Sequence, residues 1–143
     1  MSVAVKRVYE SPSRSDGTRV LVDRLWPRGL TKERAALAHW LRDLAPSNEL
    51  RRWFHEHPDQ WQNFRKKYLK ELSVPEAEAE LRLLYDLARK KKRLTLLFAS
   101  KNTIRNNAIV LKELLDGMRK PPTGTGAGVL HTMRRREAGV RRR

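Results

Sequence analysis

The stretch VLVDRLWPRG, residues 20–29, joins an apolar run to an end crowded with charges and a tryptophan. Its first three residues are continuously apolar, which indicates a β-strand buried on both faces rather than on one. Two arginines, an aspartate and a Trp-Pro pair follow directly. We therefore expect a buried strand whose polar end meets either a partner within the fold or a ligand.

The composition is that of one small globular domain. The chain has 143 residues, of which 39% are hydrophobic and 34% charged, and it contains no cysteine. The absence of cysteine excludes disulfides, thiolate metal ligands and cysteine nucleophiles. The N-terminal sequence MSVAVKRVYE lacks the apolar stretch of a signal peptide, and no run of 18 apolar residues occurs. We predict a cytoplasmic protein that does not enter a membrane.

The formal charge of +16 is unevenly distributed along the chain. Residues 119–143 carry eight Lys or Arg and one Glu, a net charge of +7, which leaves +9 for residues 1–118. This last segment is a Pro/Gly/Thr linker followed by two arginine triplets, with too few apolar residues to fold alone. We expect one domain over residues 1–118 and a flexible, disordered basic tail over 119–143.

Apolar patterning predicts three strands and five helices. The strands are expected at 3–9, 19–25 and 93–100. One helix is expected from Thr31, with Leu37, Trp40, Leu41 and Leu44 at helical spacing, and the others begin near residues 48, 58, 76 and 104. Helical crossovers between apolar strands favour an α/β fold with a small, at least partly parallel sheet of about three strands flanked by about five helices.

Polar side chains follow the strands at 19–25 and 93–100. If these strands are parallel, their carboxyl ends share one edge of the sheet, where ligands bind in open α/β folds. Arginines and a lysine near the N-terminus of the last helix would bind an anion there. We predict a cationic pocket for an anionic or phosphorylated small molecule or a nucleotide, lined by Asp23, Arg24, Trp26, Arg28, Ser100, Lys101 and Asn102.

The same residues also allow a purely structural interpretation. In that interpretation Trp26 covers the edge of the core, and Asn102 or Thr103 caps the last helix. The two strand ends are then held together by ion pairs of Asp23 with Arg24, Arg28 or Lys101. The sequence alone leaves both interpretations open.

No sequence motif identifies a reaction. His55 and His57 are two residues apart and do not share a helix face, and no HExxH pattern is present. The GTGAG stretch at 124–128 lacks the Lys and Ser/Thr of a phosphate-binding loop and is interpreted as linker. We predict no metal and no cofactor, and the sequence does not decide whether the protein is an enzyme.

The basic tail suggests a second class of partner. Its arginine triplets, together with the basic runs at 65–67 and 89–93, would contact nucleic acid through the phosphate backbone without reading its sequence. The tail residues of this alternative site are Arg134, Arg135, Arg136, Arg141, Arg142 and Arg143. A third possibility is a structural or protein-interaction module whose tail binds acidic partners.

The stretches VKRVYE, DGTRVLVDRLWPRG, APSNELRRWF, FRKKYLKEL and LTLLFASKNTIRNNAIVLKELL resemble, in this order, the YeaO-like branch of domain-of-unknown-function family 488. The similarity covers about residues 3–118 and implies a small bacterial protein of a family without an established activity. The basic tail lies outside the pattern. Asn107 stands where some relatives have histidine. The positions that match the family are Arg7, Asp23, Arg24, Trp26, Pro27, Arg28, Gly29, Ser47, Leu50, Arg51, Lys101, Asn102, Asn106 and Ala108, and on this basis Asn106 joins the candidate site.

Overall fold

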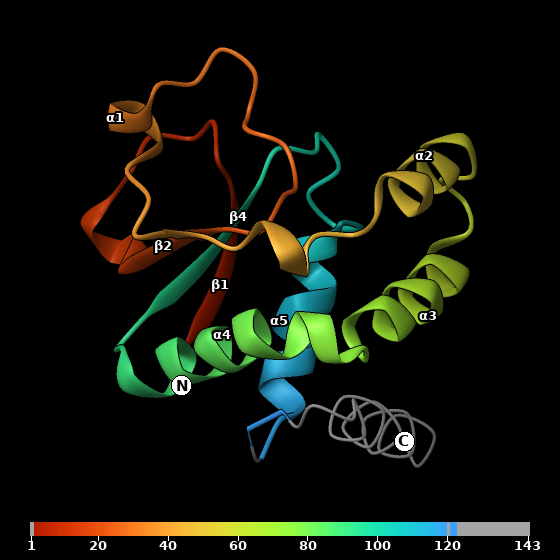
Figure 1. Ribbon diagram of the computed structural model, residues 1–143. Coiled ribbons are helices and arrows are strands. Elements are labelled where there is room, and N and C mark those ends of the chain that lie inside the picture. Colours follow the sequence, from red (N-terminus) through yellow and green to blue (C-terminus); the bar gives the residue numbers. More distant parts are fainter. Residues whose placement is uncertain (1, 120, 123–143) are drawn as a thin grey trace, which may run out of the picture.

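A computed structural model describes residues 2–119 and 121–122, and these form an α/β fold around a four-stranded parallel sheet (Figure 1). The order of the strands is β1-β4-β2-β3, with bounds β1 Val3–Arg7, β2 Thr18–Leu21, β3 His39–Trp40 and β4 Leu94–Phe98. The α-helices are α1 Lys32–Ala35, α2 Asn48–Glu56, α3 Trp61–Leu72, α4 Glu78–Lys90 and α5 Asn107–Gly117. Single 3₁₀ turns lie at η1 Arg14–Asp16, η2 Arg42–Leu44 and η3 Pro75–Ala77. The predicted fold class is confirmed, with one strand more than expected.

The strands β2 and β4 lie in the centre of the sheet and are buried on both faces. Val20 and Val22 point into the main core, whereas Leu21 between them belongs to a smaller core on the other face. β4 alternates in the same way, with Leu96 in the main core and Leu97 in the smaller one. The apolar runs of the two strands are continuous because both faces of the sheet are covered.

Different elements cover the two faces (Figure 1). The helices α3, α4 and α5 supply most of the main core, and α5 packs directly on β1 and β4. The smaller core is covered by the long connection from β2 to β3, through Trp26, Leu30 and Leu37, and by Trp40 of β3. No helix in the described part of the chain is long and apolar enough to cross a membrane.

The predicted helix from Thr31 to Leu44 is wrong. Thr31 does cap a helix, but α1 ends after one turn because Ala36 adopts a left-handed conformation with φ of 50°. The chain then pairs with β2 as the short strand β3. Trp40 packs into the smaller core, whereas Leu41 and Leu44 belong to the main core on the opposite face. The helical spacing arose because apolar side chains of one segment serve two cores.

The last helix begins later than predicted. Asn106 is its N-cap, with Oδ1 accepting a hydrogen bond from the Ile109 N–H at 3.1 Å. Ile104, near which this helix is predicted to begin, is 75% exposed in the preceding loop. Asn102 does not cap α5 but orders that loop by accepting hydrogen bonds from the backbone of residues 104 and 105. A loop over residues 99–106 therefore separates β4 from α5.

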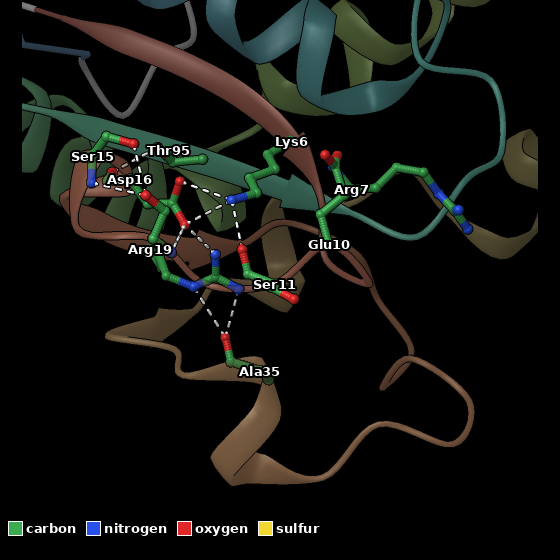
Figure 2. A network of polar contacts seen from close by, with 10 residues as sticks. Lys6, Arg7, Glu10, Ser11, Ser15, Asp16, Arg19, Ala35 and Thr95 are labelled. Atoms are coloured by element: carbon green, nitrogen blue, oxygen red, sulfur yellow. Dashed lines mark hydrogen bonds and ion pairs between the residues drawn. The ribbon is translucent and has the colours of Figure 1, made fainter.

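A buried ion cluster holds the amino end of β2 in place (Figure 2). The Asp16 carboxylate lies 2.6 Å from Arg19 Nη1 and 3.1 Å from Lys6 Nζ. The Arg19 guanidinium also donates two hydrogen bonds to the carbonyl of Ala35, at the end of α1. Thr95 of β4 donates to the backbone carbonyl of Asp16. The cluster thus connects β1, β2, β4 and α1, and it holds the end of α1 in place, from which the chain continues to β3.

Of Gly17 and Gly29, the two glycines with positive φ in the described residues, Gly17 tolerates a side chain less. Its φ is +64°, and a Cβ built there would lie 2.4 Å from the Arg93 carbonyl oxygen. We expect Gly17→Ala to lower the free energy of unfolding by about 2 kcal/mol or more, because backbone strain and a clash with main chain add together. Gly29→Ala is the matched control, since φ there is +76° but no atom lies within 4 Å of the added Cβ.

The measurement is urea unfolding of both variants. Gly29→Ala should lose only about 1 kcal/mol, the cost of a positive φ for alanine. Equal losses in the two variants would show that the approach of the Arg93 carbonyl to Gly17 contributes nothing.

Candidate functional site

A cavity of about 580 Å³ lies at the carboxyl ends of β2 and β4. Its walls come from the segment 23–28 after β2, the loop 99–106 after β4, and α2 with the residues before it. The parallel pairing of β2 with β4 brings these segments together across 75 residues of sequence. All eight predicted site residues line this one cavity: Asp23, Arg24, Trp26, Arg28, Ser100, Lys101, Asn102 and Asn106.

The cavity has a buried, largely apolar floor and an exposed cationic rim. Phe64, which is 2% exposed, lies at the floor with Ala45 and Pro46, and Phe54 is half-buried in the wall. The exposed rim residues include four cations, Arg28, Arg51, Lys101 and Arg105. With Arg24, the lining holds five cations against the one carboxylate of Asp23, which gives a formal charge of +4. The site is built to attract anions.

Arg24 and Arg28 differ in their roles. The Arg24 guanidinium donates to the carbonyls of Ala45 and Pro46, at 3.2 and 3.3 Å, and so holds the segment before α2 against the end of β2. Within residues 2–119, the side chains of Arg28, Lys101 and Arg105 make no hydrogen bond or ion pair. The backbone of Arg28 is engaged, since its carbonyl accepts a hydrogen bond from the Tyr9 hydroxyl at 2.9 Å. Arg28 and Lys101 are therefore available to a ligand.

The Asp23 carboxyl is held by neutral donors, not by cations. Its Oδ2 accepts from the Ala99 N–H at 2.8 Å, and its Oδ1 accepts from Asn107 Nδ2 at 3.1 Å. Among the described residues it makes no ion pair, so the predicted alternative pairing with Arg24, Arg28 or Lys101 is wrong. Burial raises the pKa of Asp23 by more than these hydrogen bonds and the charge of Arg51 lower it. Asp23 is thus a partly desolvated acceptor in the cavity wall.

Trp26 and Asn106 have structural contacts in addition to lining the cavity. The Trp26 indole donates to the Leu30 carbonyl at 2.6 Å and packs edge-on against Trp40 at 5.4 Å, over the smaller core. Asn106 is 4% exposed and caps α5. The structural interpretation is confirmed for Trp26, which covers the smaller core. The predicted helix cap at Asn102 or Thr103 is wrong, because Asn106 takes that place. Arg28 and Lys101 have no such structural contact in the described chain.

Several cavity residues lie outside the predicted site. Arg51 and Phe54 come from α2. No local sequence pattern predicts that this helix packs beside the carboxyl ends of the strands. Arg105 and Asn107 flank the predicted site residue Asn106 in the sequence and line the same cavity. Arg7 of β1 supports the site from outside, since its guanidinium donates to the carbonyls of Ala99 and Ser100, both at 3.0 Å.

The chain matches a family profile described as the inactive DUF488-N3 subclade over residues 2–123. The chain belongs to this family. The uncharacterized protein YeaO of Escherichia coli K12 is 47% identical over 115 residues, which cover 80% of this chain and 97% of that protein. The uncharacterized Rv3073c of Mycobacterium tuberculosis H37Rv and Mb3100c of Mycobacterium bovis are each 42% identical over 115 residues, covering 80% of this chain and 94% of theirs. No solved structure matches the chain.

This DUF488-N3 match contains every residue of the cavity and ends at residue 123. Most of the predicted basic tail over 119–143 therefore lies outside the family match. The six arginines assigned to an alternative nucleic-acid site, at 134–136 and 141–143, lie outside the described residues. The resemblance predicted from sequence motifs is confirmed for the domain.

Proposed function

We propose that this protein binds an anionic or phosphorylated small molecule in the cavity at the carboxyl ends of β2 and β4. The observation that carries the proposal is the set of cations at the rim whose side chains have no partner in residues 2–119: Arg28, Lys101 and Arg105. Exposed surface cations elsewhere also lack partners, but these three line one cavity of about 580 Å³. A phosphate in that position would accept charge-assisted hydrogen bonds from two or more of them.

The apolar floor supports a ligand that also has a ring or another apolar part. Phe54 and Phe64 stack on each other at 4.4 Å between ring centroids, and both line the cavity. Small-molecule sites combine such apolar walls with a few placed polar groups. An aromatic phosphate, of which a nucleotide is one kind, matches both features.

The proposal is one of binding, without a committed reaction. The description of the subclade as inactive supports this choice. In the wall, the Asp23 carboxyl is held by Ala99 and Asn107 rather than by a base or a nucleophile that would act with it. A receptor, carrier or regulatory role follows most directly from that arrangement.

Titration calorimetry with three probes tests the proposal. Phenyl phosphate should bind most tightly, inorganic phosphate more weakly because it leaves the apolar floor empty, and phenol most weakly because it carries no anion. The affinity for phenyl phosphate should fall as salt is raised, since the rim cations are exposed to screening. Absence of binding at low salt, or equal binding of phenol and phenyl phosphate, would contradict the proposal.

A second candidate function is non-specific nucleic-acid binding through the basic surface and the tail. The observation that favours it is a run of five exposed cations, Arg89 to Arg93, from the last turn of α4 to the amino end of β4, outside the cavity lining. We expect deletion of residues 119–143 to weaken binding to duplex DNA by about a hundredfold at low salt, because eight cations are removed.

Filter binding over a series of salt concentrations measures this effect. The full chain should show a steep decrease of affinity with salt and the truncated chain a shallower one, while the truncated chain loses only a modest part of its affinity for phenyl phosphate. DNA affinity that is unchanged by the deletion would rule out the tail as the binding element.

A further inference from the structure

We infer that Asp23 and Asn107 form a pair of hydrogen-bond acceptors inside the cavity that selects an aromatic anion carrying an N–H donor at its inner end. This inference rests on the proposed function and specifies its ligand class. The geometry of two side chains, one from the end of β2 and one from the first turn of α5, carries it.

The amide of Asn107 has a fixed orientation. Its Nδ2 donates to the Val22 carbonyl at 2.8 Å and to Asp23 Oδ1 at 3.1 Å. The reverse orientation would place an oxygen against two acceptors, so the contacts themselves assign the amide. Both hydrogens of the NH₂ group are engaged, and Oδ1 is left as the free end. Oδ1 has no hydrogen-bond partner in the described chain. It is not among the buried polar atoms that lack a partner, so it is accessible to solvent. Because Asn107 lines the cavity, we place Oδ1 toward that space.

The Asp23 carboxylate is fixed beside this amide. One oxygen accepts from the backbone of Ala99 and the other from Asn107, and each retains a lone pair for a further donor. The backbone of Asp23 is also held, because the Trp40 indole donates to its carbonyl at 2.7 Å. The wall at this point therefore offers acceptors on rigid supports.

The exposed and the half-buried residues of the cavity lining differ in hydrogen-bonding character. At the rim, Arg28, Lys101 and Arg105 offer only donors and positive charge. Among the half-buried lining residues, Asp23 and Asn107 offer acceptors, and we place them at the inner end of the site on the basis of this burial. A ligand with a phosphate at one end and an N–H group at the other satisfies both. A ligand whose inner end is apolar would bury these acceptors without a donor, which is costly.

A matched pair of aryl phosphates tests the inference. The probes are 4-aminophenyl phosphate and 4-methylphenyl phosphate, which have nearly the same size and the same phosphate but differ in whether the inner group donates. The wild-type protein should bind the amino compound at least about tenfold more tightly, the usual effect of a hydrogen bond to a charged acceptor. Asp23→Asn should reduce this ratio to about twofold or less, because it replaces a carboxylate oxygen by a donor.

The ratio of the two affinities isolates the inner contact. Any change in phosphate attraction caused by removing a negative charge affects both probes and cancels in the ratio. Asp59→Asn removes the same charge from an exposed position outside the cavity and should leave the ratio at its wild-type value.

The outcomes separate the inference from the proposed function. If the wild type binds both aryl phosphates equally, the acceptor pair does not select the ligand and the inference is overturned, while anion binding in the cavity stands. If neither compound binds, the proposed function itself fails. The ratio of the two affinities in the wild-type protein tests the inference without the variant. The test is therefore valid even if Asp23→Asn does not fold.

Discussion

Asp16→Asn should lower the free energy of unfolding by about 3 kcal/mol and the melting temperature by about 10 °C. Asp16 is 5% exposed and is the anion that both Lys6 and Arg19 contact in the cluster of Figure 2. Asparagine keeps one acceptor oxygen but removes the charge, which leaves the buried Arg19 guanidinium without a counter-ion. Breaking one side of a buried pair in this way is far more costly than losing a surface ion pair.

The loss should depend on pH in a defined direction. Burial alone would raise the pKa of Asp16, but hydrogen bonds from the Ser13 N–H, Lys6 and Arg19 outweigh it and hold the pKa below its ordinary value of 3.8. A carboxyl with a lowered folded pKa contributes stability that is fully present above pH 3.8 and is lost as pH falls through the folded value. The difference between wild type and Asp16→Asn should therefore be constant near neutral pH and shrink below about pH 4.

Chemical denaturation of wild type and variant at a series of pH values measures both effects. Asp116→Asn is the control, because Asp116 pairs with Lys112 in an exposed i,i+4 ion pair whose removal should cost less than about 0.5 kcal/mol. A loss for Asp16→Asn no larger than that of the control would mean that the buried cluster does not stabilise the fold.

The central strands were predictable because they are buried on both faces. A run such as Leu94–Phe98 has few alternatives to a covered parallel strand, and the crossover helices then require parallel neighbours. The segment from Thr31 to Leu44 was not predictable by the same means. The apolar pattern shows that Trp40 and Leu41 are apolar, but it does not predict that they pack into different cores. The decision for β3 over a helix is made by tertiary contacts.

The candidate site was predictable to the extent that it follows from strand ends. Parallel strands bring Asp23 and Lys101 to one sheet edge, whatever the connections between them. The contribution of Arg51 depends on how α2 returns to that edge, which is a matter of packing rather than of local sequence. The sequence also could not distinguish Arg24, which binds backbone carbonyls, from Arg28, which does not, because both are arginines of the polar segment after β2 and their partners lie elsewhere in the chain.

Reversing two charges at the rim of the cavity should weaken the binding of phenyl phosphate by at least about a hundredfold. The variant is Arg28→Glu combined with Lys101→Glu, and it lowers the formal charge of the cavity lining from +4 to zero. The loss combines two missing charge-assisted hydrogen bonds with repulsion between the new carboxylates and the phosphate. The fold should be unaffected within about 0.5 kcal/mol, because both side chains are exposed and contact no partner in residues 2–119.

The control for this variant has the same net charge in a different place. Arg34→Glu combined with Lys91→Glu changes two exposed cations outside the cavity and lowers the charge of the whole protein by the same four units. General attraction between a protein of charge +16 and an anion falls equally in both variants. Calorimetry should therefore show a modest loss in the control and near abolition in the rim variant. Equal losses would assign anion binding to the overall field of a basic protein, whereas a large difference assigns it to the cavity that Arg28 and Lys101 share.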